Sequence, residues 1–507
     1  MKTKRLKKFI RRFLVSMFSL LLLLGASSLL AQNELTDLQI SNAVDNQLMI
    51  NVTTPSHMID VVTTDGIVTL SGTVNNLLEK DHAVKVAQMV KGVSGVIDKL
   101  DVTTTFMSDE ELAGNVTDAL FNDPATSSYQ IMVNANNGIV TLEGEVDSWQ
   151  EKQLASYVAK GVMGVKEINN ILEVDFQTER PDFEIAQEIR DALKFDVRVD
   201  NVLIDIDVEE GEVTLSGTVG SFPEKNLAIA DAWVAGVNSV NSEDLEVKEW
   251  ARDDDLRREK YVGKADQEIK EAINQAFLYD PRVLHFDPNV TVNNGYVTLS
   301  GVVTNLQAKN AAENTARNVV GVFGVNNNLK VRPVTIPEDS ELEENISYAI
   351  EQSPVLDKEQ INVNATNGVV SLTGVVNSNY EKLMAETTAS RTKGVIEVNN
   401  YLDVFGDDEY GYYGYYGYYG WNTYFPPLYD VNPLRTSSDQ EIENRIENQL
   451  WWSPYVNQDD IEVTVTGGKA ILDGTVETLR ESHFAVINAI EGGANEVDNN
   501  LIVVYTP

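Results

Sequence analysis

The stretch GIVTLSGTV at residues 66–74 decides the fold of this chain, because the chain repeats it with small changes. Five related stretches follow: GIVTLEGEV at 138–146, GEVTLSGTV at 211–219, GYVTLSGVV at 295–303, GVVSLTGVV at 368–376 and GKAILDGTV at 468–476. Most of them begin 72 or 73 residues after the one before, with two wider gaps of 84 and 100 residues. A regular period is typical of a tandem array, so the 507 residues are predicted to hold six copies of one small unit.

One unit has the pattern of two helices and three strands. In the first unit, Ile40, Val44 and Leu48 recur every four residues, which predicts a helix with one buried face. An alternating strand follows, and Asp65-Gly66 is a dipeptide typical of a tight hairpin turn. The repeated stretch is the second strand, and a second helix and a third strand complete the unit. The sequence therefore predicts an α+β fold: six tandem small αββαβ domains, each a three-stranded mixed sheet with two helices on one face.

Two glycines and two alanines keep fixed positions in every unit. The first glycine follows a turn residue and predicts a backbone with positive φ, and the second is expected to let the sheet and a helix approach closely. The glycine pairs are Gly66 and Gly72, Gly138 and Gly144, Gly211 and Gly217, Gly295 and Gly301, Gly368 and Gly374, and Gly468 and Gly474. Alanines spaced by four share one face of the second helix. These pairs are Ala83 and Ala87, Ala155 and Ala159, Ala228 and Ala232, Ala312 and Ala316, Ala385 and Ala389, and Ala485 and Ala489.

The repeats set the domain boundaries. We predict a signal peptide at 1–31 and units at 36–104, 108–176, 181–248, 264–332, 338–404 and 438–505. A charged linker occupies 249–263, and a Tyr/Gly-rich linker with the run YGYYGYYGYYGW occupies 405–437. The second linker has much glycine and no hydrophobic period, so it is not expected to form a core.

The first 31 residues predict export. A basic stretch ending at Arg12 precedes an apolar run at 13–24 and then small residues up to Ala31. This is the layout of a secretory signal, with cleavage expected after Ala31; the alternative is a retained membrane anchor, since the apolar segment is just long enough to span. No later run is long enough to cross a bilayer. The periplasm is the expected location, with the outer surface as the alternative.

Charge and composition exclude several classes of function. The net charge of -39 repels nucleic acid, so no DNA or RNA partner is expected. The absence of cysteine excludes disulfides and thiolate chemistry. The four histidines are scattered over different units, and no nucleophile, base and acid recur together. We therefore expect no catalytic residue, no cofactor and no metal site, and no enzyme activity.

The repeats resemble the BON domain (bacterial OsmY and nodulation). The resemblance rests on the G-x-V-x-L-x-G-x-V stretch and on a later G-V-x-x-V at 92–96, 161–165 and 321–325. The last unit departs from the pattern, because Ala470 replaces the usual valine and the turn at 492–497 is longer. The resemblance implies exported bacterial envelope proteins linked to osmotic or envelope stress. It also implies a possible phospholipid-binding role, and neither an enzyme activity nor an obligatory cofactor.

Charge and aromatic residues single out two places for contact with lipid or another partner. The fourth unit carries seven bases and six acids, whereas the third carries five bases and 16 acids, so the fourth is the electrostatic choice for anionic lipid. Aromatic and basic residues gather near the end of its first helix, which suits a membrane interface. The candidate residues are Lys270, Phe277, Leu278, Tyr279 and Arg282, together with Trp451 and Trp452 at the corresponding place in the sixth unit. The alternative is that these aromatics cover the cores of their own units.

Two functional hypotheses follow. The first is a non-enzymatic exported envelope protein, in which tandem modules bind or scaffold envelope phospholipid or envelope proteins. The second is a structural or adhesive outer-surface protein that uses the Tyr-Gly segment, whose aromatic faces could stack on sugars or another chain. The identity of the ligand, the oligomeric state and the arrangement of the units stay open.

Overall fold

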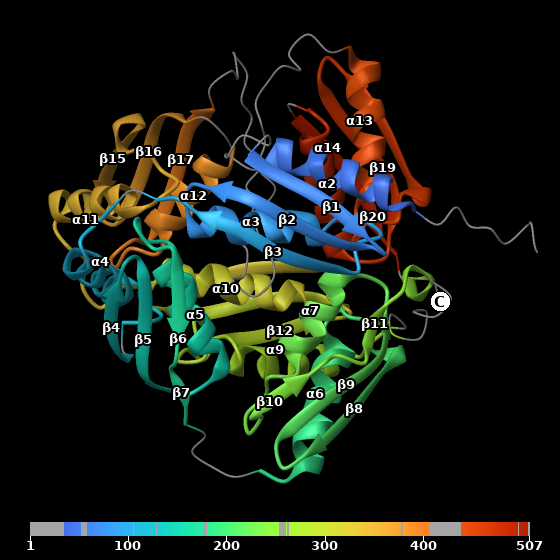
Figure 1. The fold of residues 1–507 in the computed structure, drawn as a ribbon, viewed down its shortest axis with the longest axis horizontal. Coiled ribbons are helices and arrows are strands. Elements are labelled where there is room, and N and C mark those ends of the chain that lie inside the picture. Colours follow the sequence, from blue (N-terminus) through green and yellow to red (C-terminus); the bar gives the residue numbers. More distant parts are fainter. Residues whose placement is uncertain are drawn as a thin grey trace, which may run out of the picture.

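The computed structural model describes residues 35–51, 58–104, 106–127, 129–175, 180–252, 260, 263–376, 379–404, 438–494 and 496–504. The predicted signal peptide and the Tyr/Gly-rich linker lie outside these residues, so the predictions made for them, including the adhesive role, stay predictions. The described chain forms six units with the same order of elements (Figure 1).

Each unit begins with a helix, continues through a β-hairpin and a second helix, and ends with a strand. The first three units contain α2 (Asp37–Asn51), β1 (Ile59–Thr64), β2 (Ile67–Val74), α3 (Leu77–Gln88) and β3 (Gly95–Val102); α4 (Asp109–Asn122), β4 (Gln130–Asn136), β5 (Ile139–Val146), α5 (Trp149–Lys160), β6 (Glu167–Asn170) and β7 (Glu173–Val174); and α6 (Asp182–Phe195), β8 (Ile204–Glu209), β9 (Glu212–Val219), α7 (Phe222–Asp231), β10 (Ser239–Asn241) and β11 (Leu245–Val247). A 3-10 turn, η3 (Glu249–Arg252), follows the third unit.

The last three units repeat the order. They contain α9 (Asp266–Leu278), β12 (Asn289–Asn293), β13 (Tyr296–Val303), α10 (Leu306–Arg317) and β14 (Gly324–Val331); α11 (Asp339–Gln352), β15 (Ile361–Thr366), β16 (Val369–Val376), α12 (Asn379–Ser390) and β17 (Glu397–Val404); and α13 (Asp439–Trp452), β18 (Ile461–Thr466), β19 (Lys469–Val476), α14 (Leu479–Glu491) and β20 (Glu496–Val503).

The sheets have the predicted mixed topology. In the first unit β2 is central, antiparallel to β1 and parallel to β3. The other units pair their strands in the same way, although the last strand is split in the second and third units. Val68, Leu70 and Val74 of β2 are buried beneath the helices, whereas alternate residues face outward. The predicted α+β fold of six αββαβ units is therefore confirmed.

The hairpin turns are held by an aspartate at the start of the first helix. Asp65 and Gly66 have φ of 51° and 75°, as the turn prediction requires. The carboxylate of Asp37 accepts hydrogen bonds from both of their backbone N–H groups, at 3.0 and 2.9 Å. The same arrangement recurs with Asp182, Asp266 and Asp439, and a single such bond is made by Asp109 and Asp339. The first helix is thereby fixed to the hairpin in every unit.

The second glycine of the repeat has a different role from the one expected. Gly72 has φ of 120°, and a Cβ added there would lie 2.0 Å from the carbonyl oxygen of Met58, just before β1. The obstacle is thus the backbone leading into the neighbouring strand, not a helix. Gly144, Gly217, Gly374 and Gly474 meet the equivalent carbonyl at 2.4, 2.1, 2.0 and 2.0 Å. Gly301 differs, because its nearest contact would be 3.8 Å away.

The alanine pairs form the contact between the second helix and the sheet. All twelve alanines are fully buried, and in the first unit Ala83 and Ala87 belong to the same core as Val68 and Leu70. A methyl group at these positions lets the helix axis lie close to the strands, which accounts for the regular spacing in the sequence.

The six units fold back on one another in three pairs, first with sixth, second with fifth and third with fourth. In each pair, a backbone N–H just after the second helix donates to the carbonyl of the last residue of the partner's first helix. The three bonds are Lys91 to Trp452 at 3.1 Å, Met163 to Gln352 at 2.8 Å and Val320 to Phe195 at 2.8 Å. The three donors hold equivalent positions in their units, so the pairs share one mode of contact. The units are packed together in Figure 1 rather than strung out along a line.

The first three units also make a ring through their second helices. Asp81 of α3 pairs with Lys160 of α5 at 2.5 Å, and Asn226 of α7 donates to Gln88 of α3 at 3.2 Å. Trp149 of α5 stacks on Trp233, just after α7, with centroids 5.3 Å apart. Each contact joins the first half of one helix to the end of the next. Helices and turns thus form the seams between units.

Candidate functional site

The residues predicted at the end of α9 are largely used inside the protein. Phe277 is 5% exposed and belongs to the core of the fourth unit. Arg282 is also 5% exposed, and its guanidinium makes two hydrogen bonds to Asp280, at 2.7 and 2.6 Å. Leu278 is 53% exposed and Lys270 is half-buried. The structure therefore leaves only part of this predicted contact site on the surface.

Tyr279 ties the fourth unit to the third. Its hydroxyl donates to Glu188 of α6 at 2.6 Å, and Gln275 of α9 donates to the same carboxylate oxygen at 2.6 Å. The ring packs against the core of the third unit. Burial and the neighbouring Glu188 carboxylate raise the pKa of Tyr279, so its hydroxyl stays a donor at neutral pH. Tyr279, which the sequence suggested for a membrane contact, thus joins the third and fourth units.

A cleft of about 1020 Å³ opens between α6 and α9, beside the contact of Tyr279 with Glu188. Eight acidic and five basic side chains line it, so it does not favour an anionic headgroup. At its floor, burial raises the pKa of Asp231, which also lies beside the Asp196 carboxylate. Burial opposes the ionisation of Asp196, but the adjacent Arg198 outweighs it and lowers the pKa of that carboxyl. Asp196 and Arg198 therefore pair with each other, whereas Asp231 is favoured in its protonated form.

Part of the predicted charged linker closes the third unit. The ammonium group of Lys260 donates to the carbonyls of Leu193, at 2.9 Å, and Val199. Burial lowers the pKa of Lys260 to about 8. Ala251, in η3, is buried as well. These described parts of 249–263 pack on the unit instead of extending away from it.

Trp451 and Trp452 lie at the seam between the sixth and first units. Trp452 packs against the core of the first unit, while Trp451 is 37% exposed. The two rings meet edge to face at 4.6 Å, and the ammonium of Lys91 lies 4.7 Å above the Trp451 ring. Their role in the structure is to join two units, and neither tryptophan lies beside the aromatics of α9.

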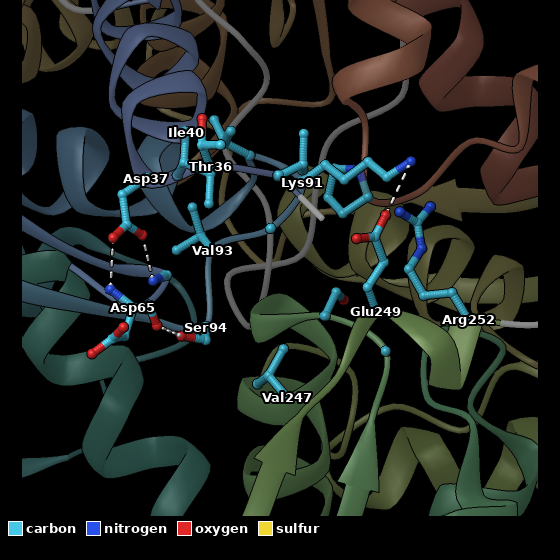
Figure 2. A pocket seen from close by; sticks show the side chains of 17 residues that line it. Thr36, Asp37, Ile40, Asp65, Lys91, Val93, Ser94, Val247, Glu249 and Arg252 are labelled. Atoms are coloured by element: carbon cyan, nitrogen blue, oxygen red, sulfur yellow. Dashed lines mark hydrogen bonds and ion pairs between the residues drawn. The ribbon is translucent and has the colours of Figure 1, made fainter. Parts of the chain in front are cut away.

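A pocket of about 440 Å³ lies where the first, third and sixth units meet, and Figure 2 shows its lining. Lys91 forms an ion pair with Glu249 at 3.2 Å across this pocket. Asp37 is turned toward the hairpin at Asp65, with which it makes the hydrogen bond described above (Figure 2). Lys91, Glu249 and Arg252 make contacts between units, so the pocket is better explained as an interface between units than as a ligand site.

The outer faces of the sheets are exposed surfaces that a partner could reach. Alternate residues of every sheet point away from the helices, and among the described residues the outer face of the fourth sheet alone lacks an acid. It carries Tyr296, 64% exposed, Val302, 52% exposed, and Lys330, which pairs with Val302 across the sheet. The third sheet shows the contrast, with exposed Asp205, Asp207, Glu209 and Glu212. The fourth sheet is thus the least repulsive surface for an anionic partner.

Sequence reasoning placed the favourable charge in the fourth unit but did not consider its sheet. The signal was available, because β13 and β14 contain no acid while the equivalent strands of other units do. The aspartate that holds each turn was missed too, although it precedes the turn glycine by 29 residues in all six units. The buried pair of Asp123 and Arg391, 2.7 Å apart, joins the second and fifth units and has no such local signal.

Neither a spanning helix nor a metal-binding group is found in the part of the chain that the structure describes. No described helix combines the length and the apolar character needed to cross a bilayer. No three acidic or histidine side chains of the described residues are grouped so that they could hold a metal ion.

Comparison with known proteins accounts for the repeats. The BON domain model matches residues 36–104, 108–175, 181–249, 265–333, 338–405 and 438–505. The chain is 33% identical over 148 residues to osmotically-inducible protein Y of Escherichia coli, which covers 28% of this chain and 74% of that protein. It is 31% identical over 144 residues to outer membrane lipoprotein DolP of Haemophilus influenzae, covering 27% and 74%.

Among solved structures, the chain is similar to the C-terminal domain of CdsD, the structural protein of the type III secretion system of Chlamydia trachomatis. The identity is 16%, with 45% of this chain and all of that domain covered, and the TM-score is 0.12. A score this low says nothing of how the units are arranged. The six family matches and the six αββαβ units agree, and the chain belongs to the BON domain family, with six copies of the domain.

Proposed function

We propose that this chain is a non-enzymatic envelope protein, exported to the periplasm, whose six BON units form a scaffold that associates with phospholipid surfaces. The names of its relatives support a role under osmotic or envelope stress, since one is osmotically inducible and the other is an outer membrane lipoprotein. The fold supports a binding role. The contacts between units are made by helix ends and turns, and alternate residues of the sheets stay exposed for partners.

The observation that carries the membrane proposal is the fourth sheet. A basic residue near an anionic bilayer contributes about 1 kcal/mol of attraction, and acids oppose it. Lys330 and the exposed Arg332 just after β14 supply that attraction, and Tyr296 has the amphipathic ring favoured at a membrane interface. Other units repel the same surface through their acids. The association is therefore weak, depends on anionic lipid and fades with salt.

Flotation of the mature protein with vesicles tests this proposal. Vesicles of zwitterionic lipid with 30% anionic lipid, on the order of a bacterial membrane's charge, should carry the protein at low salt and release it at high salt. Lys330→Glu with Arg332→Glu should abolish flotation. Lys99→Glu with Lys469→Glu, which makes the same charge change on the first and sixth sheets, should leave most of it.

The helix end of the fourth unit is the competing lipid contact. Lys270→Glu with Leu278→Ala changes two members of that site that are not fully buried, and leaves Tyr279, which joins the third and fourth units, in place. If this variant loses flotation while the Lys330 and Arg332 variant keeps it, the contact is α9 and the sheet proposal is wrong. If no vesicle of either composition carries the unmodified protein at low salt, the phospholipid role itself fails.

A further inference from the structure

The sixth unit is seated in a socket formed by three other units. On the first unit, Trp452 packs against the core while Met89 reaches in turn into the core of the sixth. On the fourth unit, Leu479 packs against the core, and Arg480 donates to Asn318 at 3.3 Å. These contacts reach into the hydrophobic cores of the first, fourth and sixth units, so the sixth unit is held by apolar packing on two sides.

A third side of the socket comes from the end of the third unit. Arg252 of η3 donates to the carbonyl of Ser453 at 3.4 Å. Ser453 follows α13 directly, so this contact and the Trp452 contact grip the same end of one helix. The face that the sixth unit presents is therefore made of the end of α13 and the start of α14, and the sheet faces outward.

The connection along the chain runs to a different unit. Residues 405–437 link the sixth unit to the fifth, and in Figure 1 the fifth unit (orange) and the sixth (red) stand apart on either side of the first (blue). Fully extended, a segment of this length reaches roughly 100 Å. The sequence of this link has no pattern that would dictate which socket its unit enters.

We infer that the sixth unit is an exchangeable module, and that its socket on the first, third and fourth units accepts the sixth unit of a second copy of this chain. The contacts made would be identical within one copy and between two, because the same residues meet in either case. The balance is then set by concentration alone. A tether of the length of residues 405–437 keeps its unit at an effective concentration on the order of millimolar or below, so single copies dominate when dilute and reciprocally exchanged dimers form when concentrated.

Opening of the socket controls the rate of this exchange. The sixth unit must lose its contacts with three units before it can enter another copy, so exchanged dimers form slowly. They also persist for a time after dilution. A surface dimer that used the outward sheets would instead form and dissociate without any opening. Slow formation coupled to transfer of the sixth unit is thus the property that separates the proposal from ordinary association.

Fluorescence energy transfer between two full-length mature copies tests the exchange. The chain contains no cysteine, so a single introduced cysteine gives one label. A donor at Ile502→Cys, 62% exposed on the sixth sheet, and an acceptor at Val62→Cys, 58% exposed on the first sheet, lie outside the socket. After mixing at high concentration, transfer should rise over time together with a dimer mass in light scattering, and should survive brief dilution.

Two further variants decide between outcomes. Deletion of residues 410–430, which leaves every described contact in place, changes the effective concentration of the sixth unit at its own socket and should therefore shift the dimer fraction at a given total concentration several-fold. Trp452→Ala with Leu479→Ala should abolish the dimer signal. The proposal is overturned if the deletion leaves the dimer fraction unchanged at every concentration, or if dimers persist at equal strength when both docking residues are removed.

Discussion

The aspartate at the start of each first helix makes the most regular contact in the molecule. Its carboxylate accepts backbone N–H groups from a hairpin turn 28 and 29 residues further along, and the turn has positive φ at both central positions. In the sixth unit, the two N–H bonds from Gly467 and Gly468 lower the pKa of Asp439. Because the folded pKa is depressed, this contribution to stability is present above the ordinary pKa of about 4 and is lost as pH falls through the lower folded value.

The signature glycines allow a matched test of backbone strain. Gly72→Ala combines a positive φ with a Cβ 2.0 Å from a carbonyl oxygen, whereas Gly301→Ala has the positive φ and no near contact. We expect Gly301→Ala to cost about 1–2 kcal/mol and Gly72→Ala about 2 kcal/mol more. Hydrogen exchange of β13 and β2 amides in the two variants measures these local losses. Equal losses would show that the close carbonyl is not the obstacle.

The carboxyl of Glu491 should make stability depend on pH. Burial raises its pKa to about 8, and the hydrogen bond from Asn488, at 3.1 Å, opposes this only in part. The folded state therefore holds a proton that the unfolded chain releases between about pH 4.5 and 8, so stability falls as pH rises through this window. Glu491→Gln should remove that fall, gaining about 2–4 kcal/mol on the unmodified protein between pH 5 and 8.

Thermal unfolding of both proteins at several pH values measures the difference. His483 has a pKa lowered to about 3 by burial and by Arg317, and so it makes stability rise over pH 3 to 6.5 in both proteins. The comparison between the two proteins cancels this contribution. Parallel curves from pH 5 to 8 would mean that Glu491 is ionised in the folded protein.

At the scale of elements, the second helix serves two partners at once. One face presents the alanine pair to its own sheet, and in the first three units the two ends meet the second helices of neighbouring units. The helix needs small residues on the first face and has freedom in the choice of residue at its ends, where a charge pair, an amide pair and two stacked tryptophans all occur.

A larger residue in the alanine face should disrupt that unit. Ala312 is fully buried in the core of the fourth unit, so Ala312→Leu should destabilise it by roughly 1–3 kcal/mol through overpacking. Val302→Leu, which adds one carbon at an exposed position on the sheet of the same unit, should change stability by less than about 0.5 kcal/mol. Urea unfolding followed by circular dichroism gives both values. A neutral Ala312→Leu would show that the helix can move away from the sheet.

The elements could be predicted from the sequence because their causes are local. Turn glycines, the four-residue spacing of Ile40, Val44 and Leu48 and the alanine pairs act within one unit, and each was found where expected. The expectation for Gly72 was wrong in its cause, because strand pairing brings Met58 close in space and the repeat pattern does not show this. The contact site at the end of α9 was predicted from residue type alone. The burial of Arg282 depends on how the chain folds around it, which residue type does not show.

At the scale of the whole molecule, the three pairs of units fold the chain back on itself. The positions that join them are separated by 402 residues for Gln47 and Gln449 and by 237 for Asn115 and Gln352. Contacts over such separations leave no period in the sequence, so the pairing could not be read from it. The use of Tyr279 and Trp452 as seams follows from the pairing and was beyond prediction for the same reason.

The second and fifth units should depend on one buried ion pair. The side chain of Asp123 is 3% exposed and that of Arg391 is 17% exposed. Asp123→Ala leaves the guanidinium in a buried place without its carboxylate and should cost about 3–5 kcal/mol. Lys469→Ala, which removes the exposed pair with Glu496, should cost at most about 1 kcal/mol. Denaturation of the two variants provides the comparison, and similar small losses would contradict the role given to Asp123.

The direction in which the sheets point has a consequence for how such an array can diversify. Exposed substitutions away from packing features change stability by about 0.5 kcal/mol or less, so the chemistry of each outward face is free to vary while the seams stay intact. The acid-covered third sheet and the acid-free fourth sheet are neighbours that differ in this way. One polypeptide can thus carry several sheet faces of different chemistry. Each face can acquire or lose a partner without disturbing the contacts between units.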